Sequence, residues 1–222
     1  MRTTVWFVRA GQSVANRQRR FQGQSNTGLT TLGIAQMQQA ADELRRQKIT
    51  CIYSSPQQVT QESAAYIAAS QQLSPQWDAA WADQNLGALT GLTRHEAQKQ
   101  FPAEMAIRVQ NPVHGAAPDA ESVGDVSRRC IAAWDGLLRR HRGQRVVVVT
   151  QALPIQMILC AVLGTPLAQA WSWRMDNGGL TCFDLYGQTS IVRCINATVS
   201  LQRADIDAAN GSLPPNPEAS FT

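Results

Sequence analysis

Apolar strand-like runs and amphipathic helical segments alternate along most of this chain of 222 residues. The run RVVVVT at 145–150 is the clearest strand, because four consecutive valines favour extended backbone buried on both sides of a sheet. Strands that alternate with helices imply a mostly parallel sheet covered on both faces. We therefore predict an α/β protein, a three-layer α/β/α sandwich around a mostly parallel central sheet. The predicted strands cover 3–9, 51–55, 145–150, 180–186 and 190–196, the last two as a hairpin, and the predicted long helices cover 31–48, 57–72, 121–141 and 155–163.

The domain boundaries follow from where this alternation stops. Between Asp83 and Pro118 only short helical pieces are predicted, around 93–100 and 104–109. Insertions of this kind often cover the carboxyl ends of the strands, where ligands bind in α/β folds. We predict one domain of residues 1–203 in which 84–118 form a cap over the pocket. The polar segment 204–222 is rich in Pro, Gly and Asn, which predicts a flexible C-terminal tail.

Composition narrows the class of protein. No stretch approaches the roughly 20 apolar residues that cross a bilayer, and no signal peptide is recognisable, so we expect a cytoplasmic protein without a membrane partner. The five cysteines lack the spacing of zinc ligands, and we predict neither a metal nor a cofactor. Cys182 and Cys194 could face each other across the terminal hairpin, although two reduced core residues are the simpler interpretation. The net charge of +4 comes from arginine clusters, two of them at expected helix ends, so no nucleic-acid partner is expected.

Several motifs, in a fixed order, carry a resemblance to a known family. They extend over nearly all of residues 3–201, and together they resemble the histidine phosphatase superfamily, to which phosphoglycerate mutase belongs. The resemblance implies a phosphoglycerate mutase-like fold. The motifs are VRAGQSVAN from Val8, FQGQSNTGLTTLGIAQM from Phe21, CIYSSPQQVTQESA from Cys51, DQNLGALTGL from Asp83, PDAESVGDV from Pro118, VVVVTQALPIQMIL from Val146, DNGGLTCFDLYG from Asp176 and INATVSL from Ile195.

The family implies a particular set of catalytic groups. A histidine after the first arginine attacks phosphorus, and a second histidine stabilises the transferring group. Two arginines neutralise the phosphoryl oxygens, and a carboxyl group from the cap side acts as general acid. These groups supply a nucleophile, a proton donor, and positive charge where negative charge accumulates.

At three of those positions the resemblance places other residue types. Ala10 stands at the position of the nucleophile, and its methyl group has no lone pair to offer. Gln151 stands at the second histidine position, where it can donate hydrogen bonds but cannot become a cation. Val59 stands where the second arginine is expected. We therefore expect a protein that is unable to use a phosphohistidine.

The remaining family positions keep their residue types. Arg9 and Asn16 match the phosphate contacts, and Asp83 falls on the general-acid position. Glu121 matches an acidic residue near the pocket mouth. The predicted catalytic residues are Asp83 and Gln151, and the predicted ligand-binding residues are Arg9, Asn16, Gln22 and Glu121.

The three histidines of the chain offer no replacement. His95 lies in the predicted cap, His114 precedes the PDAES motif, and His141 lies among arginines at an expected helix end. Each is interpreted as an ordinary surface or helix-terminal residue.

The expected pocket is close to neutral, because Asp83 offsets the charge of Arg9. With the apolar side chains of Ala10 and Val59, this predicts a small organic ligand that is at most singly anionic. One hypothesis is acid/base chemistry at Asp83 without phosphoryl transfer, of the isomerase, lyase or cyclase type, for example in a biosynthetic pathway. One alternative is an inactive pseudophosphatase that serves as a binding or regulatory partner. Another is a phosphatase inactivated by deliberate mutation. A homodimer is also left open.

Overall fold

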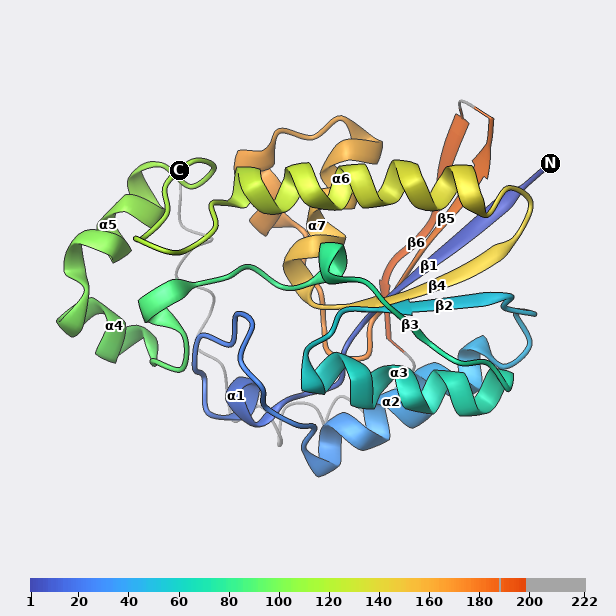
Figure 1. The fold of residues 1–222 in the computed structure, drawn as a ribbon, viewed down its shortest axis with the longest axis horizontal. Coiled ribbons are helices and arrows are strands. Elements are labelled where there is room, and N and C mark those ends of the chain that lie inside the picture. Colours follow the sequence, from blue (N-terminus) through green and yellow to red (C-terminus); the bar gives the residue numbers. More distant parts are fainter. Residues whose placement is uncertain (188, 199–222) are drawn as a thin grey trace.

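The computed structural model describes residues 1–187 and 189–198, so the predicted tail at 204–222 lies outside the described residues. A six-stranded sheet with the order β3-β2-β4-β1-β5-β6 forms its centre (Figure 1). The first four strands of this order run parallel, and β5 is antiparallel to both of its neighbours, β1 and β6. The predicted mostly parallel sheet is confirmed. The strands are β1 Thr3–Arg9, β2 Cys51–Ser54, β3 Gln76–Trp77, β4 Arg145–Thr150, β5 Leu180–Tyr186 and β6 Thr189–Ala197.

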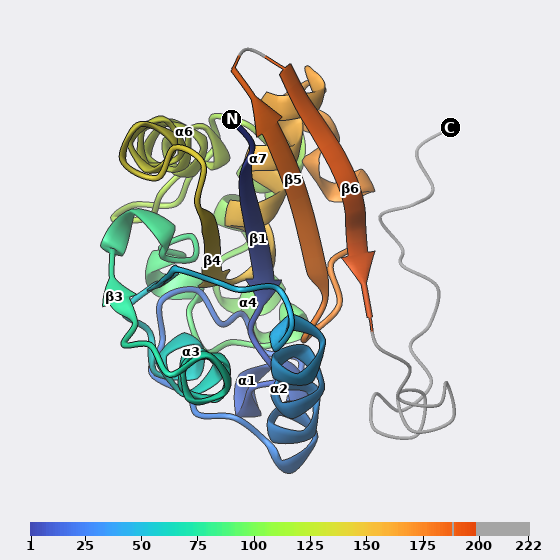
Figure 2. The same ribbon diagram turned by 90° about the vertical axis from the view of Figure 1, so that its right-hand side faces the viewer.

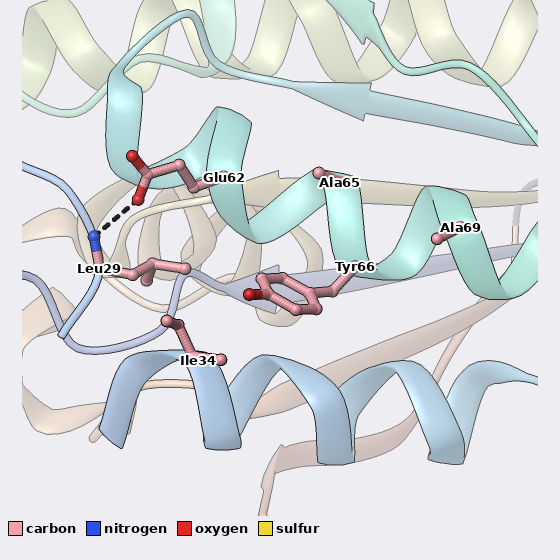
Figure 3. A pocket seen from close by; sticks show the side chains of 6 residues that line it. All are labelled: Leu29, Ile34, Glu62, Ala65, Tyr66 and Ala69. Carbon is pink, nitrogen blue, oxygen red and sulfur yellow. Dashed lines mark hydrogen bonds between the residues drawn. The ribbon is translucent and has the colours of Figure 1, made fainter. Parts of the chain in front are cut away.

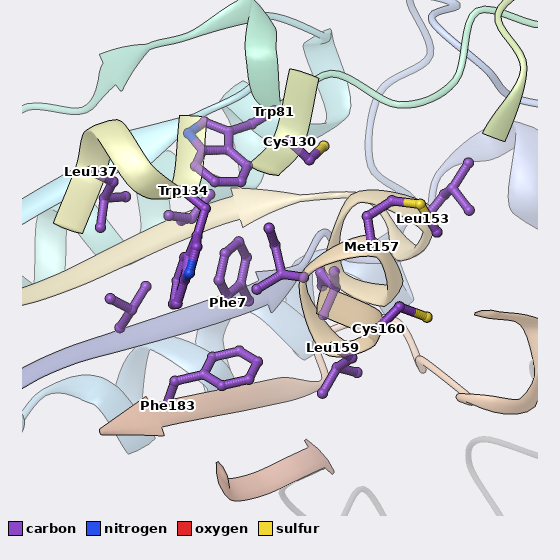
Figure 4. Close-up of a cluster of buried hydrophobic side chains, with 14 of the residues drawn as sticks. Phe7, Trp81, Cys130, Trp134, Leu137, Leu153, Met157, Leu159, Cys160 and Phe183 are labelled. Atoms are coloured by element: carbon purple, nitrogen blue, oxygen red, sulfur yellow. The ribbon is translucent and has the colours of Figure 1, made fainter. Parts of the chain in front are cut away.

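Helices cover both faces of the sheet, which completes the predicted α/β/α sandwich (Figure 2). On one face lie α2, Thr31–Leu44, and α3, Gln58–Gln71; on the other lie α6, Val123–Arg140, and α7, Ala152–Leu163. The α6 and α7 side holds an aromatic cluster in which Phe7 of β1 contacts Trp81 and Phe183 (Figure 4). The Phe7 ring centroid lies 5.5 Å from that of Trp81 and 6.0 Å from that of Phe183, so Phe7 fixes β1 against the core on this face of the sheet.

Local sequence signals predict the first residue of some helices correctly and of others incorrectly. The N-terminus of α6 is fixed by a capping box, in which the Ser122 hydroxyl accepts from the Asp125 amide and the Asp125 carboxylate accepts from the Ser122 amide. The prediction that the next helix begins after Pro154 is wrong, because α7 already begins at Ala152. A proline in the first turn is tolerated, since its missing N–H has no partner there in any helix.

The segment predicted as a cap contains the two expected short helices, α4, Arg94–Gln100, and α5, Pro102–Gln110. Together with the short helix α1, Val14–Arg17, they lie on the side to which the carboxyl ends of the strands point (Figure 1). The predicted cap segment has a small apolar core that is separate from the clusters packed on the sheet. Its role as a cover for the pocket stays a prediction. That core consists of Leu86, Leu89, Ala97 and Met105, packed against Phe21, Leu92 and Phe101.

All five cysteines are free thiols, and four of them are buried. Cys182 and Cys194 do face each other across β5 and β6, without a bond between them. Within the described ranges no group of three His, Cys, Asp or Glu side chains is placed to hold a metal ion. Every helix in the same ranges is too short or too polar to cross a membrane.

Candidate active site

The parallel pairing of β1 and β4 brings two predicted site positions together. Arg9 lies opposite Thr150 at the ends of the strands, and the Ala10 amide donates to the Thr150 carbonyl at 2.9 Å. Ala10 and Gln151, the next residues of the two segments, are therefore neighbours, and they are 0% and 3% exposed. The two residues that the sequence placed at the family's histidine positions thus meet in one buried place.

Arg9 is the cation of this place. Its Nη1 donates to the carbonyl of Met175, and its Nε is buried without a partner among the described residues. Burial lowers the pKa of the guanidinium, while the carboxylates of Asp83 and Asp176 act in the opposite direction. Arg9 is therefore a partly buried charge whose buried Nε is not satisfied by the described residues of the protein itself.

Asn16 and Gln22 are positioned by the short turn after β1. The Ser13 hydroxyl accepts from the Asn16 amide at 3.0 Å and donates to Oε1 of Gln22. Oδ1 of Asn16 accepts from the Ser13 amide and from Nδ2 of Asn177, both at 3.2 Å. Nε2 of Gln22 is buried and has no partner in the part of the chain that is described. Asn177, which sequence reasoning missed, also donates to the Ala10 carbonyl at 2.9 Å.

Asp83 is a carboxyl group whose pKa is raised by its surroundings. Burial raises its pKa to about 6, against the effects of the Gln84 amide and the charges of Arg9 and Arg129. The Gln84 amide donates to Oδ1 of Asp83 at 2.9 Å. Such a group can give or take a proton close to pH 6, which suits the predicted role in acid/base chemistry.

Glu121 contacts neighbouring protein groups through both of its carboxylate oxygens. Arg129 donates to them through Nε at 2.8 Å and Nη2 at 2.9 Å, and the Asn85 amide donates at 2.9 Å. Arg129 also donates to the carbonyls of Ala80, Ala82 and Asp83. The pair therefore fixes the segment that carries Asp83. Arg129 was missed from sequence, because its eight-residue distance from Glu121 on a predicted helix is no signal by itself.

Val59 is fully buried in the first turn of α3. Its carbonyl accepts from the Ser63 hydroxyl at 2.6 Å, and the same hydroxyl accepts from the Gly11 amide at 3.2 Å. The first turn of α3 is thus joined to the residue after Ala10. That the Val59 side chain forms an apolar wall beside Ala10 stays a prediction.

The site nevertheless contains an excess of buried donors. Nε of Arg9, Nε2 of Gln22 and Nε2 of Gln151 are all buried and lack partners among the described residues. They stand on three segments that meet after β1 and β4. Gln151 is also the N-cap of α7 and makes no side-chain capping bond, so the amides of that first turn gain nothing from it. Donors without acceptors favour an oxygen-rich anion as ligand.

The histidines stay outside this arrangement. His141 precedes β4 and contacts the Tyr53 hydroxyl at 2.9 Å, whereas Gln151 follows β4, so the length of the strand separates them. His95 is exposed on α4, and His114 is exposed in the loop after α5.

A separate hollow of about 470 Å³ lies between α2 and α3 (Figure 3). It contains one polar contact, in which the Glu62 carboxylate accepts from the Leu29 amide at 2.7 Å. None of the predicted site residues lines it. Its lining is formed by Leu29, Ile34, Glu62, Ala65, Tyr66 and Ala69.

Comparison with known proteins gives consistent results. The family model "Histidine phosphatase superfamily (branch 1)" matches residues 5–198. Phosphoserine phosphatase 1 of Hydrogenobacter thermophilus is 27% identical over 201 residues, which are 90% of this chain and 95% of that protein. A protein named "Probable phosphoglycerate mutase" from Yersinia pestis is 33% identical, over 81% of this chain and 84% of its own.

A solved structure has the same fold. It is a phosphoserine phosphatase of Entamoeba histolytica in which a histidine is replaced by alanine, in complex with phosphoserine. Its TM-score is 0.76 at 20% identity, over 88% of this chain and 97% of that one.

These relatives overturn the predicted function. They are named phosphatases or mutases, whereas the sequence led us to expect a weakly charged ligand and chemistry without phosphoryl transfer. The two alternatives, an inactive binding partner and a deliberately inactivated phosphatase, gain no support from them either. The physical reason for the error is that formal charges were counted, while the buried neutral donors of Gln22 and Gln151 cannot be recognised before the fold is known.

Proposed function

This chain belongs to the histidine phosphatase superfamily (branch 1), and from that premise we propose that it binds a small phosphate monoester at the carboxyl ends of β1 and β4 and hydrolyses it. The phosphate group lies against Arg9, with Gln22 and Gln151 as further donors. Asp83 exchanges the proton of the reaction.

The three unpartnered buried donors carry this proposal. A buried donor without an acceptor is destabilising by about 1 to 3 kcal/mol, and more when it is charged. A phosphate monoester is close to a dianion at neutral pH and brings three acceptor oxygens on one centre. A guanidinium suits such a group because its planar donors form short, charge-assisted hydrogen bonds. A singly anionic ligand would satisfy fewer of these donors.

One solved structure of the same fold supports binding of a phosphate monoester after the loss of a histidine. In the Entamoeba histolytica protein, phosphoserine is bound although a histidine has been replaced by alanine. Ala10 of the present chain is fully buried at the end of β1, beside the proposed phosphate. We infer that binding survives here in the same way.

Water is the nucleophile in the proposed reaction. The oxygen of a water molecule forms a bond to phosphorus while the ester P–O bond breaks, and Asp83 gives its proton to the leaving oxygen. The water proton passes to a phosphoryl oxygen or to solvent, and Asp83 is reprotonated from solvent. Arg9 and Gln151 stabilise the charge on the phosphoryl oxygens. Without a covalent nucleophile we expect slower turnover than in relatives that have one.

Release of inorganic phosphate from O-phosphoserine tests the activity, and calorimetric titration with vanadate and phosphate tests the site. We expect both anions to bind wild-type protein, and Arg9→Met to abolish binding and turnover together. Absence of any binding of phosphate, vanadate and phosphoserine would refute the proposal.

The stereochemistry at phosphorus tests the water step separately. A single in-line displacement inverts a chiral, isotopically labelled phosphate ester, whereas two successive displacements retain its configuration. Inversion is expected. Retention would show a covalent phosphoenzyme and would disprove direct attack by water.

A further inference from the structure

The segment after the 3-10 helix η3, Leu167–Ser172, is hydrogen-bonded to the proposed phosphate site. The Met175 carbonyl accepts from the Arg9 guanidinium, the Asn177 side chain donates to the Ala10 carbonyl at 2.9 Å, and the Gly178 amide donates to the Arg9 carbonyl at 2.9 Å. Three contacts in four residues hold this segment to the end of β1. It therefore forms a fixed edge of the site.

Arg174 stands at the start of this edge and carries a second guanidinium. Its side chain is 71% exposed, and its Nε donates to both oxygens of Asp176, at 2.9 and 3.1 Å. Its two terminal nitrogens have no partner among the described residues. A pair this exposed contributes about 0 to 1 kcal/mol to stability, so the fold has little need of it.

Asp176 is itself held in place, which limits the positions that Arg174 can take. Nδ2 of Asn196 donates to Oδ2 of Asp176 at 2.8 Å, and the Asp176 amide donates to Oδ1 of Asn196 at 2.6 Å. Arg174 therefore pairs through Nε with a carboxylate that Asn196 of β6 holds in place. Its Nη1 and Nη2 atoms remain available for a ligand. Such preorganisation reduces the conformational entropy that binding would otherwise remove.

The charge of Arg174 also acts on the site, because it lowers the pKa of Arg9. Exposure keeps it from the buried phosphate position itself. A group attached to the carbon skeleton of the ester, further out, is within the reach of such a rim residue. A carboxylate has the two acceptor oxygens that a guanidinium fork matches.

We propose that Arg174 is a specificity-determining residue that binds a carboxylate of the substrate, so that the preferred phosphomonoesters are those that carry a carboxylate near the phosphate. The inference rests on the proposed function and adds a second anionic subsite to it.

Two ligands that differ only in the carboxylate test the inference. O-phosphoserine has it and phosphoethanolamine lacks it, while phosphate and amine are shared. We expect wild-type protein to bind O-phosphoserine more tightly, and Arg174→Met to weaken O-phosphoserine about tenfold and phosphoethanolamine less than about twofold, as for the loss of one exposed charge-assisted pair. Arg174→Lys keeps the charge without the fork, and we expect an intermediate loss.

Arg128→Met is the matched control, because Arg128 is also exposed, at 78%, and also pairs with a nearby aspartate, Asp125. It should change neither affinity, and thermal midpoints should show that all variants are folded. Equal weakening of both ligands in Arg174→Met, or no weakening of either, would overturn the inference and leave the proposed function standing. If wild-type protein binds neither ligand nor inorganic phosphate, both proposals fall.

Discussion

Two arginines lie near Asp83, and they are used in opposite ways. Arg129 donates through all three of its nitrogens, to both oxygens of Glu121 and to three main-chain carbonyls. Arg9 donates through Nη1 to the Met175 carbonyl, and its buried Nε has no partner among the described residues. Asp83 is connected to both arginines, and its main-chain carbonyl accepts a hydrogen bond from Arg129. The charge of Arg9 lowers the pKa of the Asp83 carboxyl group, and the Asp83 carboxylate raises the pKa of Arg9.

The difference separates a residue that holds the structure from one that holds a ligand. A guanidinium whose donors are all paired within the chain has nothing left to bind with, and removing it breaks contacts that already exist. A buried guanidinium with an unpaired donor weakens the free protein and gains its partner only when a ligand arrives. Stability and binding should therefore respond in opposite ways to mutation of the two residues.

Arg9→Met should produce the largest loss of binding. We expect phosphate, vanadate and O-phosphoserine to bind about a thousandfold more weakly, since truncating one side of a buried charged contact costs about 2 to 5 kcal/mol. The free energy of unfolding in urea should change by less than about 1 kcal/mol, because the loss of the Nη1 bond to the Met175 carbonyl is offset by removal of the unpaired buried Nε donor. A large loss of stability with intact binding would reverse the comparison.

Asp83→Asn should reduce turnover about a hundredfold at pH 6, the lower end of what a general acid contributes. The pKa of about 6 means that the carboxyl group is protonated below that pH, so wild-type kcat should be flat in acid and fall as pH rises through 6. The variant should lose this dependence. The substrate's own titration near pH 6 is common to both proteins, and identical profiles for both would exclude Asp83 as the acid.

Arg129→Met should destabilise the fold by about 2 to 3 kcal/mol, because it leaves the half-buried carboxylate of Glu121 without its cation. Chemical unfolding measures this loss. Arg128→Met, one position earlier on α6 and exposed, should lose less than about 0.5 kcal/mol. At temperatures where Arg129→Met remains folded, its affinity for phosphate should stay within about threefold of wild type. A stability equal to that of the control would contradict the structural role of Arg129.

Gln151→Leu should give the smallest of these effects, and it should change stability and phosphate affinity in opposite directions. It removes a buried donor that lacks a partner, so the free protein should gain about 1 kcal/mol of stability. Binding of phosphate should weaken about tenfold, the value of one good hydrogen bond. Calorimetry and urea unfolding measured on the same preparation check both directions, and a loss of stability would mean that Nε2 is already satisfied in solution.

The sheet was predictable from sequence because its signals are local. The bounds of β1, β4 and β5 agree with the predicted strands, since each is an apolar run that ends at a turn. The two-residue strand β3 was missed because both of its side chains are exposed and it has no apolar pattern. Local patterns therefore define elements that are buried along their whole length.

The candidate site was predictable only in part, and for a different reason. The motifs assigned Arg9, Asp83 and Gln151 to the candidate site, and the fold brings Arg9 and Gln151 to the ends of neighbouring strands. One motif, DNGGLTCFDLYG from Asp176, includes Asn177, but it gave no indication that this segment contacts Ala10 across more than 160 positions of sequence. Hydrogen-bond satisfaction is likewise a property of the assembled fold, so the surplus of donors that reverses the expected ligand charge cannot be counted beforehand.

The position of β1 in the sheet has a consequence for folding during synthesis on the ribosome. This strand emerges first, yet its two neighbours, β4 and β5, begin at residues 145 and 180. For most of synthesis its edges have no lasting partner, and exposed apolar edges invite wrong pairing. Contacts to Arg9 and Ala10 come from residues 175–178, so a nascent chain completes the proposed anion-binding site only when the last strands leave the exit tunnel. Ligand binding can thus report that synthesis of the domain is complete.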